Sequence, residues 1–68
     1  MNFGVYARTA ARQWRELAAS ARDIADMYET RGKTREATFF REEAQDRDER
    51  ARHWQRIADA PAWKRWFM

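Results

Sequence analysis

The sequence contains no cysteine, one histidine, one proline and two glycines in 68 residues. Without cysteine the chain can form neither a disulfide nor a thiolate metal site, which fits a cytoplasmic setting. No apolar run approaches the roughly 18 residues of a membrane-spanning helix, and the N-terminal residues lack the basic and apolar segments of a signal peptide. We therefore expect a cytoplasmic protein that forms at most one small domain.

The few glycine and proline residues divide the chain. Gly32 follows a long amphipathic run, and the residue just after a helix often needs a positive φ, which glycine adopts without strain. Thr34 is predicted to cap the following helix with its hydroxyl, and Glu36 adds negative charge to the first turn. Pro61 ends that helix and can begin another.

These boundaries predict an all-α fold, an antiparallel hairpin of two helices. The first helix is expected over about 4–31, the turn over 32–34 and the second helix over about 35–59. A short C-terminal aromatic helical segment is expected over 61–68.

Alanines and aromatic residues recur at heptad spacing in both helices. In the first helix, the a positions are Ala7, Trp14, Ala21 and Tyr28, the d positions are Ala10, Leu17 and Ile24, and the e positions are Ala11, Ala18 and Ala25. In the second helix, the a positions are Ala37, Ala44, Ala51 and Ala58, and the d positions are Phe40, Arg47 and Trp54. Antiparallel folding places large residues opposite small ones, which favours close packing in a hairpin.

The middle of the second helix is strongly charged. Arg47 occupies a d position, either as a seam-edge residue with its head in water or as a polar residue that specifies a helical assembly. Ion pairs at i,i+4 spacing are predicted for Glu43–Arg47, Asp46–Arg50 and Asp48–Arg52, each contributing a few tenths of a kcal/mol.

Two extended helices of this length bury little apolar surface on their own. We therefore expect a homodimer with a four-helix arrangement, or a third segment packed across the hairpin. The open end of the hairpin could carry such a segment as an aromatic cap. Its expected members are Phe3, Val5, Tyr6, Trp63, Trp66 and Phe67.

The residue pattern does not favour catalysis. His53 has Glu49 one turn before it, an arrangement typical of a solvated surface pair. Arg31-Gly-Lys-Thr34 contains a Gly-Lys-Thr triplet, but the first glycine and the preceding strand of a phosphate-binding loop are missing. We therefore expect no enzyme activity, no cofactor, no metal and no small-molecule substrate.

Charge is distributed unevenly along the chain, whose net charge is +3. Residues 1–22 carry four cations and one anion (+3), residues 23–49 five and nine (−4), and residues 50–68 five and one (+4). A hairpin would thus have a basic open end and an acidic turn end. The residues predicted to contact a partner are Arg8, Arg12, Arg15, Arg52, Arg56, Trp63, Lys64, Arg65 and Trp66.

The sequence favours a non-enzymatic protein–protein interaction module that self-associates, such as an adaptor, an inhibitor or a regulatory accessory protein of the kind found in phages and plasmids. Opposite charges at the two ends could guide its association with itself or with another protein. An alternative is a nucleic-acid-binding accessory protein that uses the basic, aromatic-rich open end. Binding to an anionic membrane surface through the short C-terminal segment is less favoured.

The region around the turn resembles part of a tetratricopeptide repeat. The residues that carry this resemblance are Ala25-Asp-Met-Tyr28, Gly32, Glu36-Ala37 and Phe40. They cover roughly one repeat, whereas a stable array needs three or more, and the helices expected here are longer. We assign no family and transfer no peptide-binding residues.

Overall fold

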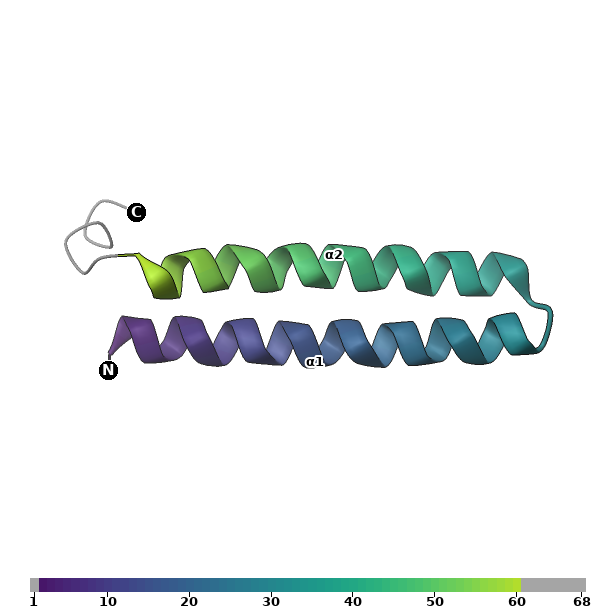
Figure 1. Cartoon of the computed structure of the whole chain (residues 1–68), viewed down its shortest axis with the longest axis horizontal. Helices are drawn as coiled ribbons and strands as arrows, with labels where there is room; N and C mark the ends of the chain where they lie inside the picture. The colour runs from purple at the N-terminus through teal and green to yellow at the C-terminus, as the bar shows by residue number, and fades with distance from the viewer. Residues whose placement is uncertain (1, 61–68) are drawn as a thin grey trace.

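The computed structural model describes residues 2–60, which form two long helices packed side by side and contain no strand. Helix α1 spans Phe3–Thr30 and helix α2 spans Thr34–Asp59. The helices run antiparallel, so the start of α1 and the end of α2 lie at the same end of the hairpin (Figure 1). The predicted all-α hairpin is confirmed for these residues, whereas the aromatic segment predicted at 61–68 lies outside the described part.

The turn is closed by Gly32, which has a φ of 73° as the sequence predicted. The Gly32 N–H donates to the Glu29 carbonyl at 3.0 Å, and the Lys33 N–H donates to the Tyr28 carbonyl at 2.9 Å. This pair of bonds satisfies carbonyls that the end of α1 would otherwise leave without a partner. The positive φ is therefore what turns the chain back toward α2.

The helix starts differ from the sequence prediction. Thr34 is the first residue of α2 rather than its cap, so that prediction was wrong. The cap is Lys33, whose carbonyl accepts from the Ala37 N–H at 3.0 Å and whose side chain makes no capping bond, because lysine has no acceptor. The start of α1, by contrast, is capped by Asn2, whose side chain accepts from the Gly4 N–H at 2.8 Å.

The interior between the helices is made of alanine. Among the described residues no large side chain is fully buried. Small side chains on both helices let the two backbones approach closely, so the seam is tight but encloses little apolar volume. The buried alanines are Ala7, Ala10, Ala11, Ala18, Ala21 and Ala25 of α1 and Ala37, Ala44, Ala51 and Ala58 of α2.

Helix α1 is rotated relative to the predicted a/d seam. The e-position residues Ala11, Ala18 and Ala25 are completely buried, whereas the d-position Leu17 is 45% exposed. The prediction that Leu17 packs in the seam was therefore wrong. The alanines at positions a and e form a smoother row than the mixed a/d set, so α2 packs on that row. Among the d residues Leu17 turns outward and Ile24 is half-buried, whereas the small Ala10 stays buried.

This rotation gives the hairpin two unlike long sides. One side carries the d and g positions of both helices together with the neighbouring c positions of α2, among them Phe39, and we call it the apolar side. The other carries the b and e positions together with the neighbouring f positions, and we call it the arginine side. The α1 residues Leu17 and Arg15 illustrate the division, because Leu17 belongs to the apolar side and Arg15 to the arginine side.

Candidate interaction surfaces

The apolar side exposes several large side chains that nothing in the described chain covers. Phe3, Tyr6 and Leu17 are 48%, 47% and 45% exposed, and Met27 and Phe39 are 40% and 55% exposed. Scattered single apolar residues are normal on a surface, but a group along one side of a small protein marks an interaction site. The partly buried residues that complete this side are Ile24, Phe40, Trp54 and Ile57.

Aromatic rings gather on the apolar side at the open end. Tyr6 meets Trp54 edge-on with ring centroids 5.5 Å apart, and Phe3 lies 6.1 Å from Tyr6 and 6.5 Å from Trp54. This cluster links the first turns of α1 to the last turns of α2. In the predicted cap these rings would meet Trp63, Trp66 and Phe67, which lie outside the described residues.

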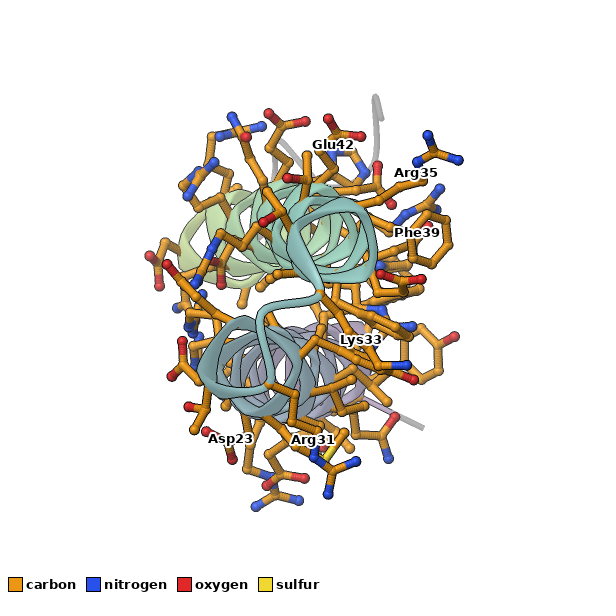
Figure 2. All side chains as sticks on the ribbon, turned by 90° about the vertical axis from the view of Figure 1, so that its right-hand side faces the viewer. Asp23, Arg31, Lys33, Arg35, Phe39 and Glu42 are labelled. Carbon is orange, nitrogen blue, oxygen red and sulfur yellow. The ribbon has the colours of Figure 1, made fainter. Side chains whose placement is uncertain are left out.

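A second aromatic group lies on the same side near the turn. Tyr28 stacks on Phe40 with centroids 5.7 Å apart, and Phe39 meets Phe40 edge-on at 5.1 Å. Seen end-on from the turn, Phe39 projects sideways from α2, away from the space between the helices (Figure 2). Its ring is therefore exposed and does not pack into the interior.

Two arginines occupy the middle of the apolar side. The Arg47 Nη1 donates to the Leu17 carbonyl at 3.1 Å, and its Nη2 lies 3.8 Å from Glu43. Arg50 bonds Asp46 at 3.0 Å and lies over the Trp14 ring at 5.1 Å. Arg47 is thus at the edge of the seam, but its head contacts the α1 backbone as well as water.

The arginine side is joined by polar bonds between the helices. Arg15 donates to Gln55 at 3.2 Å, and Arg22 pairs with Asp48 at 2.6 Å. The predicted Asp48–Arg52 pair is wrong, because Asp48 pairs with Arg22 on the opposite helix instead. The predicted Glu43–Arg47 and Asp46–Arg50 pairs are confirmed.

Nearer the turn, Arg41 makes a similar bridge. Its Nη1 lies 3.3 Å from Asp26, and its Nη2 pairs with Glu29. Two carboxylates of α1 therefore hold one guanidinium of α2. The excess of acidic residues in the middle of the sequence is thus partly neutralised by arginines from the facing helix.

Three shallow hollows follow one another along the arginine side. The first, of about 260 Å³, is lined by Arg8, Thr9, Arg12, Arg15 and Gln55. The second is lined by Arg15, Asp48, Ala51, Arg52 and Gln55, and the third by Arg22, Arg41, Ala44, Gln45, Asp48 and Arg52. The hollows share residues, so they form one groove between the helices, with its most basic section toward the open end.

The structure brings together part of the predicted contact set. Arg8, Arg12, Arg15 and Arg52 line the groove, and Arg56 is exposed one helical turn beyond Arg52. The other predicted residues lie outside the described part of the chain. They are Trp63, Lys64, Arg65 and Trp66.

The apolar side was not predicted as a site, although its residues were visible. Leu17 and Phe40 were assigned to the seam because of their heptad spacing. Heptad spacing alone does not reveal the rotation of a helix when alanine flanks the seam on both edges. The pattern that could have shown it is the unbroken alanine row at position e.

His53 is exposed and lies 5.8 Å from the ring of Trp54, centroid to centroid. No group of three or more histidine, aspartate or glutamate side chains among residues 2–60 could hold a metal ion. None of the helices described is long and apolar enough to cross a membrane.

Comparison of the chain with protein-family models, with curated proteins and with solved structures found no match.

Proposed function

We propose that this protein is a non-enzymatic helical interaction module that self-associates through its apolar side, so that two hairpins form a four-helix arrangement. The observation that carries the proposal is the contrast between the interior and the apolar side. Among the described residues, those fully buried are ten alanines and Gly4. Phe3, Tyr6, Leu17, Met27 and Phe39 remain exposed on one side, and of the exposed large apolar residues in 2–60 only Val5 lies on the other. Most of the apolar surface that could stabilise the fold is therefore outside the single hairpin.

The size of the exposed surface supports a second copy as the occupant. The chain exposes 5310 Å², whereas a compact protein of 8.3 kDa exposes about 4,600 Å². The difference, about 700 Å², approaches the roughly 800 Å² that each partner buries in a stable interface. One symmetric contact between two hairpins would thus bring the exposed area per chain to a value normal for its mass.

The charges on the apolar side also permit self-association. Arg47 and Arg50 are each paired within α2, with Glu43 and Asp46 respectively. These two cations and two anions balance one another within α2, while Glu16 and Asp23 of α1 are exposed beside them. The opposite charges within the two helical pairs favour a defined register between two copies.

Sedimentation equilibrium of matched variants tests this proposal. Leu17→Glu places a charge on the apolar side, and Ala19→Glu places the same charge on an exposed position of α1 away from it. We expect a dimer of 16.6 kDa, twice the 8.3 kDa chain, for the wild type and for Ala19→Glu. Leu17→Glu should be monomeric, whether or not its helix content falls, because a buried unpaired charge is strongly unfavourable.

Two results would overturn the proposal. A wild-type monomer at high protein concentration would mean that the apolar side serves a different protein. Equal masses for Leu17→Glu and Ala19→Glu would mean that association uses another surface. Whether the dimer acts as an inhibitor or as an adaptor depends on the protein that it contacts.

A further inference from the structure

We propose that the arginine side, at its open-end half, binds the phosphate backbone of a nucleic-acid duplex without reading its sequence. The binding residues are Arg8, Arg12, Arg15, Arg52 and Arg56. This surface is opposite the one used for self-association, so the inference does not depend on the dimer. Two hairpins joined by their apolar sides would display two such surfaces, facing outward.

The first support is that these arginines are available. Within the described chain, Arg8, Arg12, Arg52 and Arg56 have no carboxylate partner, whereas Arg22, Arg41, Arg47 and Arg50 are all in ion pairs. Several carboxylates on this side have other partners: Asp48 pairs with Arg22, Asp59 accepts from Gln55 at 3.0 Å, and Asp26 and Glu29 hold Arg41. Glu49 is exposed one turn before Arg52 and two turns before Arg56, so the basic strip of the described chain contains one carboxylate.

The second support is the arrangement of the free arginines across the seam. Arg8, Arg12 and Arg15 of α1 line one hollow together with Gln55 of α2, and Arg15 lines the next hollow together with Arg52 of α2. Arg56 is exposed one helical turn beyond Arg52. Arginines of both helices therefore lie along the basic section of the groove.

The third support decides between duplex and single-stranded ligands. A protein that binds single strands combines cations with aromatic rings on which bases stack. Among residues 2–60, those that line the basic hollows include no aromatic ring. Phe3, Tyr6 and Trp54 pack against one another on the apolar side instead. Arginines without stacking partners fit phosphate contacts, which position a protein on a duplex but carry no base specificity.

This proposal differs in one feature from the nucleic-acid alternative drawn from the sequence. The sequence places basic and aromatic residues together at the open end, which suggests phosphate binding combined with base stacking. In the described part of the chain, Phe3, Tyr6 and Trp54 lie on the side opposite the arginines. Phosphate contacts without base stacking by these rings favour a duplex as the ligand.

Salt-dependent binding measures the number of phosphate contacts. We would follow the fluorescence anisotropy of a labelled DNA duplex of about 20 base pairs in buffers from about 20 to 200 mM salt. Four to five arginine–phosphate contacts predict a slope of about −4 in a plot of log K against log salt. An RNA duplex should give a similar slope, and a single strand of the same length should bind more weakly.

A matched pair of variants locates the site. Arg12→Gln/Arg52→Gln removes two arginines from the groove, and Arg31→Gln/Arg35→Gln removes two exposed, unpaired arginines at the turn end. Both lose the same charge. The first should reduce the magnitude of the slope by about 2, whereas the second should leave it nearly unchanged. Circular dichroism would verify that both variants keep their helix content.

Three experimental results would overturn this proposal. No duplex binding at the lowest salt would overturn it. Equal losses in the two double variants would show that only the net charge matters. Tighter binding to a single strand than to the duplex would overturn the choice of ligand.

Discussion

At the scale of single residues, Gly32 determines how the chain reverses. Its φ of 73° lies in the left-handed region, and a Cβ built on it would meet no atom within 4 Å. The requirement for glycine is therefore one of backbone conformation and not of space. The two carbonyl bonds made at the end of α1 depend on this conformation.

We predict that Gly32→Ala lowers the free energy of unfolding by about 1 kcal/mol, the cost of placing a Cβ in the left-handed region. Gly32→Asn should cost less, because asparagine tolerates that region better. Denaturant unfolding followed by circular dichroism would measure both. An alanine variant as stable as the wild type would contradict the role given to the turn.

Some residue contacts were predictable from the sequence and others were not. The i,i+4 pairs of Arg47 and Arg50 follow from helical spacing alone. Asp48 also has an arginine at i+4, but it pairs across the seam with Arg22. Sequence spacing describes one helix at a time, so it cannot rank a neighbour on the same helix against one on the facing helix.

At the scale of the helices, the alanine rows determine how α1 and α2 meet. Ala18 is completely buried and Ala44 nearly so. Alanine is also a strong helix former, so the same residues favour the helices and their close approach. The all-α hairpin was therefore predictable. The rotation of α1 did not follow from heptad spacing, because that spacing is equally compatible with a seam of a and d residues and with a seam of a and e residues.

We predict that Ala18→Leu separates the helices and lowers the free energy of unfolding by about 1 to 3 kcal/mol, the usual cost of overpacking. Ala19→Leu, at the next and exposed position, should change it by less than about 0.5 kcal/mol. Thermal and denaturant unfolding of the two variants would measure the difference. If the two changes had equal effects, the alanine seam described here would be wrong.

At the scale of the whole molecule, the hairpin divides its surface by chemistry. Apolar and aromatic residues lie along one side, and unpaired arginines lie along the open-end half of the other. The sequence predicted the basic open end but placed its aromatic residues in the same site. Only the fold shows that Tyr6 and Arg8, two residues apart, belong to opposite sides, because helical geometry turns them apart.

The two proposed functions use different sides of the hairpin. Association through the apolar side would cover the exposed rings and leave Arg8, Arg12, Arg15, Arg52 and Arg56 in solvent. A dimer would then offer a phosphate-binding surface on each outer face. Self-association and duplex binding are therefore compatible in one molecule and separable by mutation.

The central claim is that the hairpin is completed by a second copy, and the most direct test is its melting temperature as a function of protein concentration. When folding is coupled to dimer formation, the melting temperature rises with concentration, because association stabilises only the folded state. We predict a steady rise between about 1 and 100 μM chain, measured by circular dichroism. A melting temperature that stays constant over this range would contradict the account.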